Sequence, residues 1–193
     1  MARKPPPPLW RPPTDRPARI LIVRLSALGD VIHALPAVVA LRQALPDARI
    51  DWVVEDRAAP IVRGRSEVDR AIVFPRRELQ GLLKRPVALT SRAGAFQREL
   101  REGDYDVSID LQGNLKSGVV MRLSGARVRV GTDRRDSREA SHLFAHKHVR
   151  PPDGIHHRVE RNLAIVSQVL GRPLAWVDPG LPEVPGAAER AAY

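Results

Sequence analysis

The folded part of the chain is expected to begin with an apolar run that stops at a small polar turn, R-I-L-I-V-R-L-S-A-L-G-D-V-I-H-A-L-P at residues 19–36. A run of β-branched and aliphatic residues is typical of a strand buried on both faces, as in parallel sheets. Gly29 and Asp30 follow this strand and precede a second apolar segment. In doubly wound sheets, ligands bind beyond the carboxyl ends of the strands, so Asp30 is a candidate catalytic or ligand-binding carboxylate. Spacing alone favours a simpler role for Asp30 as a helix N-cap.

Strand-like and helix-like segments alternate after this first unit. Strand candidates lie at residues 20–25, 50–54, 71–74, 107–111 and 128–130. Helical patterns lie at residues 36–45, 91–102, 114–123 and 157–170, with Pro36 in a first turn, Asn114 as a cap and Gly171 as a stop. This alternation predicts the α/β class: a Rossmann-like, doubly wound, mostly parallel sheet with right-handed crossovers.

The amino-acid composition limits the classes of molecule that this chain is expected to bind. The 193 residues carry a formal net charge of +10, from 32 Lys and Arg against 22 Asp and Glu. This excess favours anionic partners, and arginine suits bidentate contact with phosphate and carboxylate. Aromatic residues make up only 4%, which leaves no base-stacking platform and argues against nucleic acid. No apolar run is long enough to span a bilayer and no signal peptide is visible, so a soluble, cytoplasmic protein is expected.

Both ends of the chain differ from its middle. Residues 1–18 are proline-rich and basic, which predicts a disordered tail; a docking arm for an anionic surface or a proline-recognising partner is the alternative. Residues 173–193 are punctuated by proline and glycine, as in an interdomain linker. The sequence therefore predicts one domain at residues 19–172, followed by a linker toward a C-terminal domain that is missing from these 193 residues.

A second polar turn follows the fourth predicted strand, with the sequence D-L-Q-G-N-L-K-S at residues 110–117. Gln112, Asn114 and the N-terminus of the next helix can all hydrogen-bond a polyol or an anion. An ordinary strand–helix loop with a good cap is the alternative. Two such turns at one edge of a sheet favour a binding site there more than either turn does alone.

Basic residues gather in the connections that follow strands. Arg76 and Arg77 come after the third predicted strand, and Arg134, Arg135 and Arg138 come after the fifth. Loops after parallel strands open onto the ligand edge, so these arginines can clamp an anionic ligand. For any single one of these arginines, solvated surface charge is the more common explanation.

Other familiar chemistry lacks its sequence signature. The chain has no G-x-G-x-x-G, no phosphate-binding G-x-x-x-x-G-K-[ST] and no G-x-S-x-G nucleophile elbow. His142 and His146 have the spacing of two metal ligands on a helix, but no acid completes the set and the chain has no cysteine. A metal site is therefore not expected.

Four segments, taken in order, resemble one family. The segment at residues 19–36 and D-W-V-V-E at residues 51–55 look like the start of a bacterial ADP-heptose:lipopolysaccharide heptosyltransferase of glycosyltransferase family 9. Y-D-V-S-I-D-L-Q-G-N-L-K-S at residues 105–117 and H-R-V-E-R at residues 157–161 fit the same pattern. The resemblance runs from residue 19 to about residue 171. It implies the N-terminal half of a GT-B-type glycosyltransferase, in which two Rossmann-like halves face a cleft.

The resemblance also implies roles for individual residues. Asp30 is expected to be the catalytic base in an inverting transfer of heptose from ADP-heptose to the lipopolysaccharide inner core. Acceptor-binding residues are expected at Ser26, Gly29, Arg76, Arg77, Gln112, Gly113, Lys116 and Arg138. No cofactor or metal is implied, because the nucleotide sugar is a donor substrate, bound mainly by the absent C-terminal half.

The implied partners are the anionic glycolipid of the inner core and the nucleotide sugar, with peripheral contact at the inner face of the cytoplasmic membrane. Without a donor-binding half, these residues alone are expected to fold but not to transfer sugar. The alternative is a non-catalytic module that keeps an anion- or glycan-binding cleft derived from such an enzyme.

Overall fold

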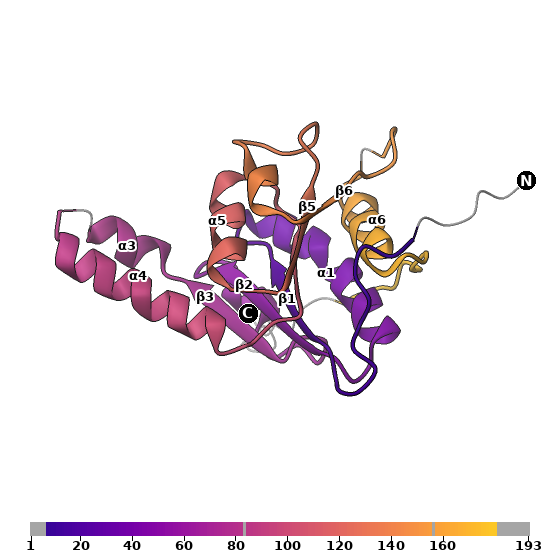
Figure 1. Ribbon diagram of the computed structural model, residues 1–193, viewed down its shortest axis with the longest axis horizontal. Coiled ribbons are helices and arrows are strands. Elements are labelled where there is room, and N and C mark those ends of the chain that lie inside the picture. The colour runs from indigo at the N-terminus through magenta and orange to yellow at the C-terminus, as the bar shows by residue number, and fades with distance from the viewer. Residues whose placement is uncertain (1–6, 83, 156, 181–193) are drawn as a thin grey trace, which may run out of the picture.

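The computed structural model describes residues 7–82, 84–155 and 157–180. A six-stranded sheet has the order β3-β2-β1-β4-β5-β6, and every neighbouring pair is parallel (Figure 1). The strands are β1 (Arg19–Val23), β2 (Arg49–Glu55), β3 (Arg70–Phe74), β4 (Val107–Asp110), β5 (Val128–Thr132) and β6 (Lys147–Val149). The strand order reverses between β1 and β4, which is where ligand sites form in doubly wound sheets.

Helices cover both faces of the sheet (Figure 1). They are α1 (Leu28–Ala44), α2 (Ala59–Val62), α3 (Arg76–Gly81), α4 (Pro86–Arg101), α5 (Leu115–Leu123) and α6 (Arg158–Leu170), with a 3-10 turn η1 (Ser141–Phe144). The core on one face includes α1 and α6, and the core on the other includes α4 and α5. Alternate β1 residues serve the two cores, Ile20 and Ile22 on one face and Leu21 and Val23 on the other. The predicted doubly wound α/β fold is confirmed.

The five predicted strands are confirmed as β1 to β5, with small shifts at their ends. The sixth strand, β6, was not predicted. It is a three-residue edge strand with two exposed side chains, so it has no apolar run to mark it. Short, polar edges of this kind also discourage pairing with other chains.

Two helices begin earlier than the sequence predicted. α1 begins at Leu28 rather than at Pro36, and α4 begins at Pro86. Pro36 therefore lies inside α1, where it removes one main-chain N–H from the helix. The turns before Pro36 stay helical because Val31 and Leu35, one turn apart, are both buried against the sheet.

Residues 7–18 pack against the domain, which corrects the prediction of a disordered tail for that part of the chain; residues 1–6 lie outside the described residues. Trp10 is 7% exposed and joins the core that includes α1 and α6, and its main-chain N–H donates to Val169 O at 3.1 Å. Arg16 pairs with Asp106 at 2.6 Å. Proline content led to the wrong expectation, because the buried Trp10 side chain and the Arg16–Asp106 pair hold a segment without regular structure against the domain.

The chain after α6 continues without a regular element through residue 180. Leu174 N donates to Ser167 Oγ at 3.0 Å, and Trp176 is 59% exposed. Residues 181–193 lie outside the described residues. The linker assigned to residues 173–193 therefore stays a prediction.

A buried polar pair joins β2 to the segment before β4. Tyr105 Oη donates to Asp51 Oδ2 at 2.7 Å, and both side chains are buried. Burial, assisted by this hydrogen bond, raises the pKa of the Tyr105 phenol well above its ordinary value. The folded protein therefore holds the phenol proton more tightly than the unfolded chain does.

This difference predicts alkaline destabilisation that depends on Tyr105. Its contribution to the free energy of unfolding is complete below the unfolded pKa of about 10 and is lost as pH rises through the higher folded pKa. We expect the stability of the wild type to fall more steeply above about pH 10 than that of Tyr105→Phe. Near neutral pH the variant should be less stable by about 1–3 kcal/mol, because Asp51 loses a donor. Urea unfolding across this pH range measures both effects, and parallel curves for the two proteins would contradict the assignment.

Candidate functional site

The loop after β4 is held together by the buried Asp110 carboxylate. It accepts from Gln112 N at 2.8 Å, Gly113 N at 3.0 Å and Ser117 Oγ at 2.8 Å. Burial raises the pKa of Asp110, and these hydrogen bonds oppose that rise. Asn114 caps α5 by accepting from Ser117 N at 3.0 Å, while Ser117 Oγ accepts from Asn114 N at 3.1 Å, so the predicted cap is confirmed.

Gln112 joins this loop to the turn after β1. Its Oε1 accepts from Leu25 N at 2.7 Å and from Ser26 N at 3.2 Å. The next residue, Gly113, has a φ of +74°, and a Cβ there would lie 3.0 Å from Thr132 Oγ1. Glycine therefore suits this position, and the two polar turns meet at one edge of the sheet.

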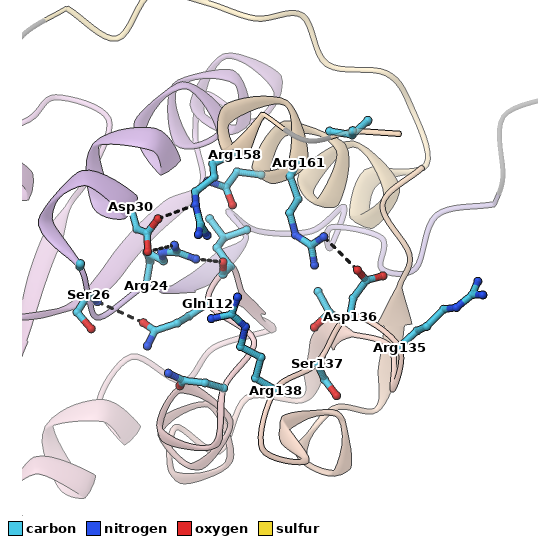
Figure 2. A pocket seen from close by; sticks show the side chains of 16 residues that line it. Arg24, Ser26, Asp30, Gln112, Arg135, Asp136, Ser137, Arg138, Arg158 and Arg161 are labelled. Carbon is cyan, nitrogen blue, oxygen red and sulfur yellow. Dashed lines mark hydrogen bonds and ion pairs between the residues drawn. The ribbon is translucent and has the colours of Figure 1, made fainter. Parts of the chain in front are cut away.

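Asp30 lies in the first turn of α1, and its carboxylate is paired with two arginines. Arg24 Nη2 is 2.8 Å from Oδ2, and Arg158 Nε is 3.2 Å from Oδ1 (Figure 2). The residue at the N-cap position of α1 is Ala27. The N-cap interpretation of Asp30 is therefore wrong, because α1 begins before Asp30 and its two oxygens are paired with guanidinium groups.

The first of these arginines is part of the protein interior. Arg24 Nη1 donates to the main-chain oxygen of Leu111, and Trp52 Nε1 donates to the main-chain oxygen of Arg24 at 3.1 Å. Burial lowers the pKa of Arg24, while the nearby Asp30 carboxylate opposes the shift. Arginine remains protonated in proteins, so Arg24 brings a fixed positive charge to Asp30.

A cavity of about 620 Å³ opens beside Asp30, and we call it the Asp30 cavity (Figure 2). Its charged lining residues are Arg24, Asp30, Arg135, Asp136, Arg138, Arg158 and Arg161. Asp136 pairs with Arg161 at 3.1 Å. Arginines outnumber carboxylates in this lining, so the Asp30 cavity suits an anionic ligand.

A second cavity, of about 640 Å³, lies on the other side of the turn after β1, and we call it the α3 cavity. Ser26 and Ala27 line both cavities, so this turn forms the wall between them. The charged residues that line the α3 cavity are Glu55, Asp56, Arg57, Arg76 and Arg77.

Two arginines of the α3 cavity already have acidic partners. Arg76 pairs with Glu55 at 3.2 Å, and Arg77 pairs with Asp56 at 3.2 Å. Lys116 Nζ also contacts Glu55, at 2.6 Å. Glu55 is buried, while its partners Arg76 and Lys116 are partly exposed. An anion that enters the α3 cavity therefore competes with the protein's own carboxylates for these cationic side chains.

The residues predicted for the site are divided between the two cavities. Asp30, Gln112 and Arg138 line the Asp30 cavity, Arg76 and Arg77 line the α3 cavity, and Ser26 lines both. The other predicted residues, Gly29, Gly113 and Lys116, line neither. Gly113 contacts the loop that carries Arg138, since its main-chain oxygen accepts a hydrogen bond from Arg138 N at 2.7 Å.

Sequence reasoning missed Arg24, Arg158 and Arg161. A weak signal existed for Arg24, because it is a charged residue within the apolar run predicted as a strand at residues 20–25. Arg158 and Arg161 belong to H-R-V-E-R, which served only to support the family resemblance. Their approach to the carboxylates comes from the packing of α6 beside α1, which spacing along the sequence does not reveal.

Within the part of the chain that the structure describes, no group of three or more His, Cys, Asp or Glu side chains could hold a metal ion. His142 Nδ1 lies 2.9 Å from Ser137 Oγ, and His148 Nε2 lies 3.0 Å from the main-chain oxygen of His142. Among the described helices, none is long and apolar enough to cross a membrane.

Comparison with known proteins decides the family. A family model described as glycosyltransferase family 9 (heptosyltransferase) matches residues 93–192. The chain belongs to this family. The resemblance inferred from the four motifs is thus confirmed, and with it the Rossmann-like fold of a GT-B-type glycosyltransferase.

Individual relatives agree with the family match. This family 9 chain is 38% identical over 160 residues to lipopolysaccharide heptosyltransferase 1 of Pseudomonas aeruginosa, covering 81% of this chain and 44% of that protein. For the Escherichia coli K12 heptosyltransferase 1, identity is 35% over 156 residues, covering 79% and 48%. The solved structure "E. coli heptosyltransferase WaaC with ADP-2-deoxy-2-fluoro heptose" matches with a TM-score of 0.73 at 33% identity, covering 83% and 51%. The chain spans about half the length of these relatives.

Proposed function

We propose that this chain is the acceptor-binding half of a lipopolysaccharide heptosyltransferase and that Asp30 is its catalytic base. The observation that carries the proposal is the position of Asp30. Its carboxylate lies at the carboxyl end of β1, beside a cationic cavity, and is 25% exposed. The heptosyltransferase names of its relatives supply the reaction class.

The proposed chemistry is a single displacement that inverts the anomeric configuration. Asp30 takes the proton of an acceptor hydroxyl as its oxygen attacks the anomeric carbon of the heptose. The new C–O bond forms as the bond from the anomeric carbon to the diphosphate breaks, and ADP leaves with the electron pair. The step needs a proton acceptor and a positioned hydroxyl, and no cofactor takes part in it.

The proposed acceptor is the inner core of lipopolysaccharide, which carries 3-deoxy-manno-octulosonic acid carboxylates and phosphates. The arginine-rich lining of the Asp30 cavity supports an anionic acceptor. The α3 cavity, across the turn that holds Ser26, offers room for a second anionic group of the same extended ligand. The formal charge of +10 also favours work at an anionic surface, and we propose peripheral contact with the inner face of the cytoplasmic membrane.

We assign ADP-heptose binding mainly to the other half of a two-domain enzyme, because the chain spans about half the length of its relatives. A non-catalytic anion- or glycan-binding module is the second candidate. The pairing of both Asp30 oxygens with arginine favours it, since such pairing also suits a structural carboxylate. Transfer that depends on Asp30, with a donor-binding half supplied, separates the two candidates.

Acceptor binding should depend on salt and on the loop arginines. Arg138→Ala is expected to weaken binding of a soluble inner-core oligosaccharide by about 3- to 10-fold, the range between an exposed and a partly desolvated contact. Arg76→Ala and Arg77→Ala should cost less, because their guanidinium groups already have carboxylate partners. Raising ionic strength should weaken binding by the wild type more than by Arg138→Ala.

Isothermal titration at several salt concentrations measures these affinities. Arg101→Ala is the matched control, since Arg101 is exposed at the end of α4 and lines neither cavity. Equal losses for Arg101→Ala and Arg138→Ala would mean that net charge, and not a specific site, attracts the acceptor.

A further inference from the structure

The two arginines that hold Asp30 differ in how freely they can move. The Arg24 side chain is 5% exposed, whereas the Arg158 side chain is 53% exposed. Arg24 is also tied to the main chain of Leu111 through Nη1. Any exchange of partners at the Asp30 carboxylate must therefore occur on the Arg158 side.

Arg158 and Asp30 lie on different helices, α6 and α1, and α6 is held in place by its packing against α1. Arg158 is the first residue of α6, and α6 packs beside α1 in the same core. Asn162, one turn further along α6, donates from Nδ2 to the main-chain oxygen of His33 in α1 at 3.0 Å. The backbone of Arg158 is thus anchored while its exposed side chain can change rotamer.

The guanidinium of Arg158 uses only its Nε edge on Asp30. Nε lies 3.2 Å from Oδ1, and no other partner of Arg158 is found among the described residues. Its two terminal nitrogens remain for a ligand in the Asp30 cavity, which Arg158 lines (Figure 2). A guanidinium fork matches the oxygens of a carboxylate or phosphate. The Arg158–Asp30 pair joins an exposed arginine to a partly exposed carboxylate, so solvent screening weakens it relative to a buried pair.

We infer that Arg158 binds an anionic group of the acceptor. An anion bound there draws the Arg158 guanidinium away from Asp30 Oδ1, and this oxygen then accepts the hydroxyl proton. Arg24 keeps the other oxygen and acts as a positioning residue. This inference rests on the proposed role of Asp30. Its consequence is selectivity: an acceptor exposes the base only when it carries an anion close to the reacting hydroxyl.

The exchange is testable without catalysis, on the 193-residue chain. Inorganic phosphate and 3-deoxy-manno-octulosonic acid are the probes, added at constant ionic strength. In NMR spectra, we expect saturable shifts of the Arg158 Nε–H and the Asp30 carboxyl carbon, while the Arg24 Nη signals move less. In Arg158→Gln the Asp30 shift should disappear, and in the matched charge control Arg101→Gln it should persist. Saturable binding of both probes that leaves the Arg158 and Asp30 signals unmoved would overturn the inference, as would absence of binding.

Kinetics with a donor-binding half supplied give a second, independent test. Arg158→Gln should raise the acceptor KM about tenfold, the size of one charge-assisted contact, with little change in kcat. Arg158→Lys should restore part of the affinity. Arg24→Lys should instead lower kcat, because the base loses its orienting contact. A fall in kcat with unchanged KM for Arg158→Gln would make Arg158 a second positioning residue and would contradict its role in binding the anionic group. Full activity of Asp30→Asn would reject the proposed base while leaving the phosphate result at Arg158 intact, so the two failures are distinguishable.

Discussion

Asp30→Asn is expected to lower kcat for heptose transfer by about 10²- to 10⁴-fold, the usual contribution of a general base. The amide keeps the size of the side chain and an oxygen that can accept from one arginine, but it cannot take up the hydroxyl proton. The acceptor KM should change much less, because the cationic lining that we assign to acceptor binding is retained. Initial rates of ADP release, measured with the donor-binding half supplied, give kcat and KM separately.

Asp136→Asn is the matched control, since Asp136 lines the same cavity and is also paired with an arginine. We expect its kcat to stay within about threefold of the wild type, well below the loss of a general base. If Asp136→Asn lost activity and Asp30→Asn kept it, Asp136 would be the base instead. Loss in neither variant would favour another proton acceptor.

The largest expected effect on stability is that of Trp10→Ala. Trp10 is 7% exposed and packs in the core that includes α1 and α6, although it lies in a proline-rich segment without regular structure. Truncation of a buried aromatic side chain costs about 3–5 kcal/mol, and we expect the lower end, because a segment without regular structure relaxes more easily than a central strand. Urea unfolding monitored by far-UV circular dichroism measures the change.

Trp176→Ala is the control for Trp10→Ala. Trp176 is 59% exposed and follows α6 in an irregular segment. Its replacement should change the free energy of unfolding by less than about 0.5 kcal/mol. A loss for Trp10→Ala as small as that for Trp176→Ala would contradict the packing of the Trp10 side chain in the core.

The central part of the fold could be predicted because its signals are local. A short window of sequence is enough to predict the strand β1 from its apolar run and the Asn114 cap of α5. β6 was missed, because a short polar edge strand is defined by its neighbour β5 and not by its own composition. Trp10 was missed for a related reason, since composition averages over a segment and one side chain decides its packing.

The meeting of the two polar turns could be predicted from the sequence, because the carboxyl ends of parallel strands share one edge of a sheet. Whether a ligand binds at that edge stays a prediction. The environment of Asp30 could not be predicted in this way. Arg24 directly follows β1, a few residues before Asp30, whereas Arg158 is the first residue of α6, more than a hundred residues later in the sequence. Such contacts depend on how α6 docks beside α1.

The contact of Gln112 with the turn after β1 has a consequence for how the protein folds. Leu25 N and Gln112 Oε1 are joined across 87 residues of chain. Closing so long a loop costs conformational entropy before any contact repays it, so parallel sheets with distant pairings fold slowly. Until β1 meets β4, the turn that carries Ser26 lacks the side chain that fixes it. The Asp30 cavity is therefore complete only once β4 has joined β1, because Gln112 and Asn114 in its lining follow β4, and a folding intermediate that contains only β1, β2 and β3 lacks that part of the lining.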